Sequence, residues 1–505
     1  MKRSSRNNLF NRFIVSLIVF LVVFFIYTRM LPTDFTTANN GADGGDLLSA
    51  ILTGGIPHPT GYPTYLIFGK LFQLIPFGTP YYKGALLSLV FSSLAAGLLS
   101  YYFRFAHGDE DNSAASVVAV FVVGIVLGTT PLFWSQGIIV EVYGLQSFFM
   151  VCIILWLLLI MRGQVSGRID TVLTILSLII GLSTGNHMMI VLMAPMVIFA
   201  YISAYKNGAD PQKLLKYTGL IAAVAVLVYA ILPLRARQYP PINWGNPQTF
   251  EGFIWLISGR LYHGLAFGLP PADIIQRIGY YAKFLLEQFG ILGLFIGILG
   301  AVKIAAAPGR MKWVYLWMFF IYSIFSIGYL TNDSIVYLIP TLMVFSIWIG
   351  TGIQDLWNDL EGNPIFGKVV VCLFFLLLLF RLPDIRDRVD PREDNTARLF
   401  VEQCFNTLPQ NAIILTNSDA DTFPLWYYHF GLGQRLDIRV IVEGLVSFEW
   451  YRETIAHTYP GLVFPEKDVL NLSEQFMALN PQVSVCRTQV DSGATSSIRC
   501  VCPKE

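Results

Sequence analysis

The stretch VYGLQSFFMVCIILWLLLIM, residues 142–161, runs for twenty residues without a charged side chain. A helix of this length rises about 30 Å, which matches the thickness of the hydrocarbon core of a bilayer. Hydrophobic residues make up 54% of the 505-residue chain and charged residues only 13%. That proportion of charge is well below the average of soluble domains. We therefore expect a polytopic α-helical membrane protein.

Ten further segments resemble this one in length and hydropathy, so the sequence predicts about eleven membrane-spanning helices. They are residues 13–31, 83–104, 114–133, 170–184, 187–205, 214–234, 284–305, 313–330, 335–353 and 366–382. The first follows four basic residues but lacks a small-residue cleavage site, so we expect a retained anchor helix. Only Gly185 and Asn186 separate two of the segments, and a single long helix here would reverse the orientation of everything after it.

The distribution of Lys and Arg predicts the orientation of the chain. With eleven spans, most basic residues of the loops fall on the side of the N-terminus, which is cytoplasmic by the positive-inside rule. The short opposite loops around Ser135, Gly185 and Asn332 carry none, and only the long loop 235–283 departs from the pattern. We expect the C-terminal region outside the cytoplasm: in the periplasm or exterior if the protein sits in a bacterial inner membrane, and in the lumen if it sits in the endoplasmic reticulum.

The composition changes near Pro383 to that of a soluble domain. We therefore expect a transmembrane domain over residues 1–382 and an extracytoplasmic α/β domain over residues 383–505. A helix near residues 397–408 precedes two buried strands, AIILT at 412–416 and IRVIV at 438–442, which flank a helical segment. This order predicts one βαβ unit.

Six cysteines occur in the chain, and Cys152 and Cys372 fall inside predicted spans as apolar side chains. The other four belong to the outer domain: Cys404, Cys486, Cys500 and Cys502. An even number of thiols outside the cytoplasm favours disulfide bridges, and free thiols or a zinc site at Cys500 and Cys502 are the alternatives. A hairpin turning at residues 491–493 would bring Cys486 opposite Cys500 or nearly so.

The first outer loop, GADGGDLLSAILTGGIPHPTGYP at residues 41–63, holds the most informative polar residues. Asp43 and Asp46 follow the first span between glycines that let a ligand approach the backbone. Paired carboxylates at a membrane surface suit either a general base or a divalent cation site, whereas helix capping is the plainer interpretation, above all for Asp46. His58 stands between two prolines and is held in a rigid turn.

More polar and aromatic residues occur at the same predicted face, at the ends of other spans. Ionisable groups at such depth are costly, so we expect them to be functional or, as for Glu141, paired with an arginine. The predicted spans hold almost no charge, which argues against a channel or a pump. Together with His58, the candidate substrate-binding residues are Tyr62, Glu141, Tyr143, Asn186, His187, Arg235, Arg237, Trp244 and Asp333.

Six separated motifs resemble, in order, those of the membrane proteins related to transmembrane protein O-mannosyltransferases, which belong to the GT-C class of lipid-donor glycosyltransferases. They are GGD-x-x-x-A with GIPHPTGYPTYLIFGKLFQLIPFG, LFWSQGIIVEVYGL, GLSTGNHM, LPLRARQYPPINWGNPQT, DSIVYLIP and the outer segment LPQNAIILTNSDADTFPLWYYHFGLGQRLDIRVIV. The resemblance extends over about residues 42–450. Family members usually have Asp-Ser-Gly-Glu where this chain has Asp43-Gly44-Gly45-Asp46.

The resemblance implies that Asp43 is the catalytic base and that Asp46 takes the second acidic place. It implies transfer of a sugar, mannose in particular, from a polyprenyl-phosphate donor to an acceptor hydroxyl outside the cytoplasm. The acceptor is a protein or, as an alternative, a glycolipid, and arginines such as Arg235 hold the donor phosphate. A lipid-linked sugar transporter or flippase is the competing function, and a non-catalytic scaffold is a third. A net charge of +1 excludes nucleic acid as a partner, whereas membrane lipids are one.

Overall fold

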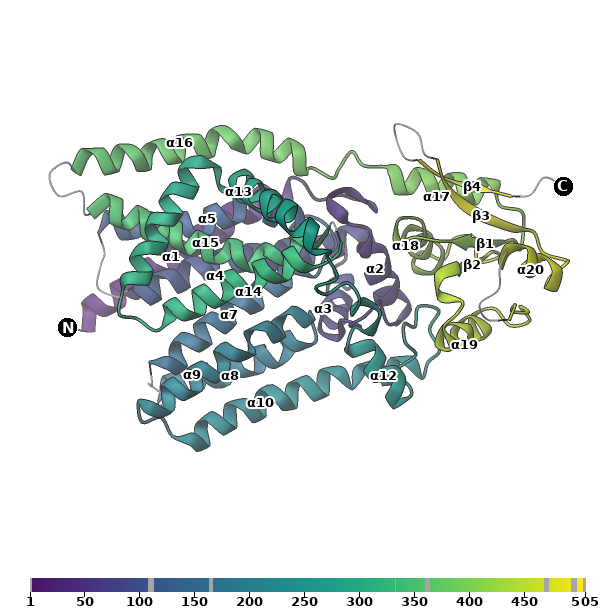
Figure 1. Cartoon of the computed structure of the whole chain (residues 1–505), viewed down its shortest axis with the longest axis horizontal. Coiled ribbons are helices and arrows are strands. Elements are labelled where there is room, and N and C mark those ends of the chain that lie inside the picture. Colours follow the sequence, from purple (N-terminus) through teal and green to yellow (C-terminus); the bar gives the residue numbers. More distant parts are fainter. Residues whose placement is uncertain are drawn as a thin grey trace.

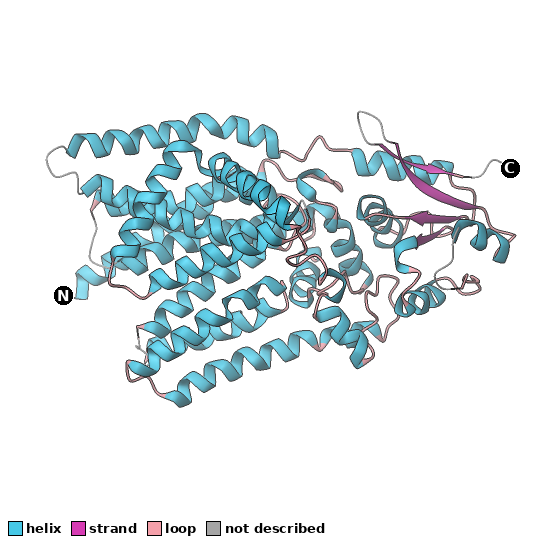
Figure 2. Ribbon diagram, viewed as in Figure 1, coloured by secondary structure: helices cyan, strands magenta, loops and turns pink. Residues whose placement is uncertain are grey.

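A computed structural model describes residues 2–107, 113–162, 167–331, 333–358, 364–466, 472–491 and 497–502. A bundle of long helices forms most of the molecule, and a small α/β domain sits at one end of it (Figures 1 and 2). The long helices are α1 (Lys2–Thr28), α4 (Pro80–His107), α5 (Ala114–Thr129), α7 (Tyr143–Met161), α8 (Arg168–Thr184), α9 (Ala194–Lys206), α10 (Pro211–Tyr229), α13 (Pro271–Ala306), α14 (Met311–Gly328), α15 (Ile339–Asn358) and α16 (Pro364–Val389).

All eleven predicted spans coincide with these helices. Within the described ranges, eight segments are long and apolar enough to cross a membrane, and two further apolar helices, Phe13–Thr28 and Ala114–Thr129, are shorter. α8 ends at Thr184 and the chain turns at Gly185, which confirms the predicted break between two helices. α7 and α15 are the most buried spans, whereas α10 and α16 expose most of their side chains at opposite edges of the bundle (Figure 1).

Shorter helices connect the spans. They are η1 (Ala38–Asn40), α2 (Asp43–Thr53), α3 (Pro63–Gln73), α6 (Pro131–Gln136), η2 (Met188–Met193), α11 (Ile231–Ala236), α12 (Phe250–Ile257), η3 (Arg260–Tyr262) and η4 (Asp333–Leu338). α2, α3 and α12 lie between the long helices and the α/β domain (Figure 1). α13 begins well before the predicted start of its span and is kinked at Gly290, where φ is +68°. The connecting helices thus form a layer at one end of the bundle.

The outer domain contains the predicted βαβ unit. β1 (Ile413–Thr416) pairs in parallel with β2 (Arg439–Val442), and α18 (Asp419–Trp426) with η5 (Tyr427–Gly431) connects them. β3 (Val485–Asp491) lies on the other side of β1, giving the order β2-β1-β3-β4 with β4 (Ser497–Val501) antiparallel at the edge. The remaining elements are α17 (Thr396–Thr407), η6 (Glu443–Leu445), α19 (Glu449–Thr458) and α20 (Leu472–Leu479).

The predicted opposition of Cys486 and Cys500 is wrong. Cys486 is bonded to Cys502, and Cys500 lies opposite Thr488. The physical reason is the register of the hairpin. Arg487 pairs with Val501 in antiparallel strands, so Cys486, just before Arg487, meets Cys502, just after Val501. The turn expected at residues 491–493 falls largely outside the described residues. A bridge within the hairpin was expected, but its partner depends on a turn length that the sequence does not reveal.

The two domains are joined by hydrogen bonds to the first outer loop. α16 continues through Pro383 to Val389, so the predicted boundary at residues 382–383 falls inside a helix. Five residues later, Asp394 accepts hydrogen bonds from the Thr36 hydroxyl at 2.6 Å and from the backbone N–H groups of Thr37 and Ala38. The outer domain therefore fixes the loop that leads into α2.

Candidate active site

α2 carries both predicted acids and lies against the outer domain. The N-cap of α2 is Ala42, Asp43 is the first residue of the helix, and Asp46 lies one turn later. Neither acid therefore caps the helix. A Cβ atom on Gly45 would stand 2.4 Å from the backbone oxygen of Phe423 in α18, so only glycine permits this approach. The sequence Gly44-Gly45 thus allows the membrane domain and the outer domain to meet beside the acids.

Asp46 is completely buried and bonded on both oxygens. Its Oδ2 accepts hydrogen bonds from the His58 backbone N–H at 2.8 Å and from the imidazole Nδ1 at 2.6 Å. Its Oδ1 accepts a hydrogen bond from the Trp244 indole at 3.2 Å. A buried carboxylate with this many donors is well satisfied. Asp46 therefore holds the ring of His58 in one orientation and is shielded from any substrate.

His58 connects Asp46 to Asp43. Its Nε2 lies 3.7 Å from Asp43 Oδ2 and 3.0 Å from the Tyr62 hydroxyl. Burial favours the neutral ring, but the charge of Asp43 and the hydrogen bond to Asp46 outweigh it and raise the pKa of His58 to about 9. The imidazole is therefore a fixed cation at neutral pH.

Asp43 is the open end of this chain of contacts. Its side chain is 43% exposed, while that of Asp46 has no exposure. Removal from water on its protein side raises the pKa of Asp43 above the ordinary value, and the His58 cation acts in the opposite direction. A carboxylate held by a cation and facing solvent has the position and charge of a general base.

A third acid approaches from the outer domain. Asp419 is the first residue of α18. Partial removal of its carboxyl from water, and next the negative charge of Asp43, raise the pKa of Asp419 to about 6. Sequence reasoning missed this residue. The only local signal is the capping box of Ser418 with Asp421, which marks the start of a helix but does not reveal that the helix faces α2.

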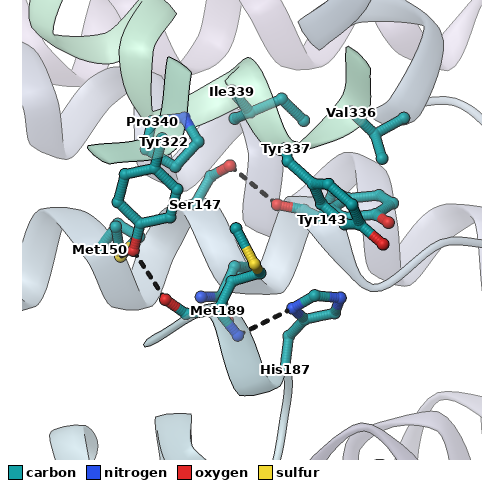
Figure 3. A pocket seen from close by; sticks show the side chains of 11 residues that line it. Tyr143, Ser147, Met150, His187, Met189, Tyr322, Val336, Tyr337, Ile339 and Pro340 are labelled. Carbon is teal, nitrogen blue, oxygen red and sulfur yellow. Dashed lines mark hydrogen bonds between the residues drawn. The ribbon is translucent and has the colours of Figure 1, made fainter. Parts of the chain in front are cut away.

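A pocket lies beside this centre, between α7, η2, α14 and η4 (Figure 3). His187 lies within it, with ring centroids 5.6 Å from Tyr143, 6.0 Å from Tyr337 and 6.0 Å from Tyr62. Because Tyr62 also bonds His58, the pocket adjoins the acids. The buried Gln146 amide lines the pocket, and its Nε2 has no hydrogen-bond partner among the described residues. A donor left unpaired at such a depth is costly, so it suits a polar ligand.

The other candidate residues are placed as follows. Asn186 is buried and donates to the Val142 carbonyl at 3.3 Å and to Gln146 Oε1 at 3.2 Å, so it fixes the pocket wall. Glu141 is buried and accepts a hydrogen bond from the Val142 N–H at 3.2 Å. It forms no ion pair with an arginine in the described part of the chain, so the structural alternative proposed for it is not observed.

Two arginines and one further acid are the last of the candidate residues. Arg235 is half-buried and donates from Nη1 to the Gly55 carbonyl at 2.9 Å, which leaves most of its guanidinium N–H groups available. Arg237 is exposed two residues later. Asp333 is exposed at the start of η4, and its negative charge adds to the rise in the pKa of Asp43.

Asp43 and Asp46 do not fit a divalent cation between them. The donor set is already committed, because both oxygens of Asp46 accept hydrogen bonds and the His58 ring stands between the two carboxylates. Hard cations such as Mg²⁺ need several free oxygen ligands. The residue that faces Asp43 is instead a positively charged imidazole, which repels a cation from this pair.

Two family models match the chain. Residues 43–209 match the protein O-mannosyl-transferase TMEM260 N-terminal domain, and residues 397–459 match TMEM260-associated domain 2. A mouse (Mus musculus) protein O-mannosyl-transferase TMEM260 is 25% identical over 89% of the chain, and a Dictyostelium discoideum protein of the same name is 22% identical over 84%. The chain covers 65% and 57% of the length of these relatives, which is less than two thirds of each.

Solved structures show the same fold. ArnT from Cupriavidus metallidurans bound to undecaprenyl phosphate superimposes with a TM-score of 0.59 and 13% identity, covering 97% of both chains. The oligosaccharyltransferase of Archaeoglobus fulgidus, in complex with Zn and sulfate, superimposes with a TM-score of 0.54 and 14% identity. The match covers 93% of this chain and 68% of the oligosaccharyltransferase chain. The chain is therefore an integral membrane protein with a GT-C-like fold. Within that fold, the chain is similar to the proteins named protein O-mannosyl-transferase TMEM260.

Proposed function

We propose that this protein is a glycosyltransferase that moves mannose from a polyprenyl-phosphate donor to a hydroxyl group of a protein, at the extracytoplasmic face of its membrane. The observation that carries the proposal is the chain of contacts Asp46–His58–Asp43, which ends in a solvent-facing carboxylate between the membrane and outer domains. The names of the relatives support the mannose and the protein acceptor. The undecaprenyl phosphate bound to ArnT supports the class of donor.

In the proposed reaction, Asp43 accepts the proton of the acceptor hydroxyl as the oxygen attacks C1 of the sugar. The new bond forms between that oxygen and C1, on the face opposite the phosphate, so the anomeric configuration inverts. The bond between C1 and the phosphate oxygen breaks, and its electron pair stays on the polyprenyl phosphate. General base catalysis of this kind typically contributes about 10²- to 10⁴-fold.

The neighbouring residues act on Asp43 or on the donor. The His58 cation keeps Asp43 ionised and oriented, and Asp46 is a positioning residue that acts through His58. Arg235 binds the donor phosphate with its remaining N–H groups, because a planar guanidinium can hold two phosphate oxygens at once. The pocket of Tyr143 and His187 has a volume of only about 20 Å³, so the sugar lies at its mouth, beside Asp43.

The proposal is tested by incubating the purified protein with radiolabelled polyprenyl-phosphate sugars and an acceptor protein domain. We expect transfer from the mannose donor and a loss of about a hundredfold or more in Asp43→Asn, since the amide keeps the shape but not the basicity of the carboxylate. Asp273→Asn is the matched control, because Asp273 is an exposed acid at the start of α13 outside the site. Near-normal turnover of Asp43→Asn would overturn the role of the acid.

The competing functions give different results in the same assay. A glycolipid acceptor would be labelled in place of the protein, and the rest of the mechanism would stand. A transporter or flippase would move the donor across a vesicle membrane without any new glycosidic bond. Such carriers often use helices broken near mid-membrane by an unwound segment. Movement of the donor across the membrane without a new glycosidic bond would reject the proposal that the protein is a glycosyltransferase.

A further inference from the structure

A second cavity lies at the end of the bundle opposite the candidate active site. Its volume is about 370 Å³, and it is formed where α4 and α7 end and where the chain passes from α13 into α14. α7 begins with Tyr143 in the pocket of the active site and ends with Met161 in this cavity, so one helix connects the two. The lining combines three cations with apolar side chains: Arg162, Arg310 and Lys312 with Leu158, Ile304 and Met311.

The three cations are held in place by backbone carbonyls. Arg162 donates from Nη2 to the Phe105 carbonyl at 3.1 Å and stacks on the Phe105 ring. Arg310 donates from Nη1 to the Ser203 carbonyl at 3.2 Å. Lys312 donates to the Ala305 and Ala307 carbonyls at 3.0 and 2.8 Å. Each guanidinium has five N–H donors, so most of them remain available.

The three cations of the cavity differ from two nearby lysines in their charge partners. No ion pair joins any of the three to a carboxylate within the described ranges. Lysines at the same end of the bundle but outside the cavity differ. Lys216 lies 3.4 Å from Asp170, and Lys303 lies 2.5 Å from Asp355. Three cations without an ion pair among the described residues therefore line this one cavity.

We propose that this cavity binds the phosphate headgroup of an anionic phospholipid. A phosphate is attracted by these cations, and its oxygens match the forked donors of two arginines. The apolar side chains of Leu158, Ile304 and Met311 line the same cavity, so the glycerol and the first carbons of the acyl chains find a matching wall. Basic pockets between membrane helices are a recognised form of anionic lipid site. Free phosphate is also an anion, but it has no apolar part that could pack against these side chains.

The site is tested by native mass spectrometry of the full-length protein in detergent, titrated with phosphatidylglycerol or with phosphatidylcholine of the same acyl chains. We expect the wild type to retain phosphatidylglycerol in preference, and the double variant Arg162→Gln/Arg310→Gln to bind it about tenfold more weakly. The double variant Lys206→Gln/Lys213→Gln removes the same charge near the same end, outside the cavity lining, and we expect it to bind like the wild type.

The charge-preserving double variant Arg162→Lys/Arg310→Lys separates loss of charge from misfolding. We expect it to bind phosphatidylglycerol more strongly than the glutamine variant and less strongly than the wild type, because lysine keeps the charge without the fork. Thermal melting with inorganic phosphate distinguishes the two sources of the anion. Equal retention of both lipids, equal loss in the lining and control variants, or stabilisation by inorganic phosphate without any preference for phosphatidylglycerol would overturn the lipid site.

Discussion

The two ends of α7 show opposite treatments of charge. At the end that begins with Tyr143, the ionisable groups are tied to one another, as in the contacts of His58 with Asp46 and Asp43. At the other end, Arg162 bonds only a backbone carbonyl and a ring among the described residues. Both ends are rich in polar groups, but among the described residues only the first joins a cation to two carboxylates in one chain of contacts.

The difference indicates what each end is built to do. Buried charges are costly unless they are paired, and pairing fixes both their geometry and their protonation state. Chemistry on a bound sugar needs such fixed groups, because a misplaced base loses most of its effect. Cations with unused donors need an anion from outside the protein. We therefore expect variants at the first end to change reaction rates and pH dependence, and those at the second to change binding alone.

The largest effect that would test this comparison is expected at Asp46. Asp46→Asn removes the charge that orients and protonates His58, so we predict that kcat falls by about 10- to 100-fold, as for other positioning residues behind a reactive group. The pKa of His58 should also fall, since Asp46 contributes to its rise to about 9. The basic limb of the pH–rate profile would then move to lower pH.

The pH profile separates positioning from a merely structural role. Trp244→Phe is the matched control, because it removes the other hydrogen bond to Asp46 while leaving its charge and the contact with His58. We expect that variant to keep the wild-type basic limb. An Asp46→Asn protein that is less active but has an unshifted profile would contradict the connection through His58.

The features predicted well are those that depend on neighbouring residues. Each span is a continuous apolar run, and Asp43 and His58 belong to one loop, so their proximity followed from the sequence. The burial of Asp46 did not, because it depends on Trp244, which comes from a loop almost two hundred residues away. The approach of Asp419 depends on how the outer domain docks on α2. Asp43 and Asp419 are separated by the whole membrane bundle in sequence, and no local pattern relates them.

The next effect concerns stability at the outer end as a function of pH. The pKa of His58 rises from 6.5 to about 9 on folding, so its contribution is complete below pH 6.5 and is lost as the pH rises to 9. That contribution is about 3 kcal/mol at most. The rise in the pKa of Asp419 to about 6 acts below this window and leaves it undisturbed.

We therefore expect the melting temperature in detergent to fall by several degrees between pH 6.5 and pH 9. His58→Gln has no ring to titrate, so its melting temperature should vary less over the same range, whatever its absolute value. Parallel pH curves for the two proteins would show that His58 is not a buried cation.

The smallest effect concerns the contact that makes the outer end possible. In Gly45→Ala, the added Cβ would stand 2.4 Å from the Phe423 backbone oxygen and 2.8 Å from the Phe35 ring, so α2 and α18 must separate. We expect a loss of about 1 to 2 kcal/mol, typical of overpacking, and easier proteolysis between the domains. Gly219→Ala makes the same change in α10, where no atom lies within 4 Å of the new Cβ. Since alanine is the better helix former by up to about 1 kcal/mol, this control should be neutral or slightly stabilising. If both variants melted alike, the close approach of α2 to the outer domain would not be what holds Asp43 and Asp46 between the two domains.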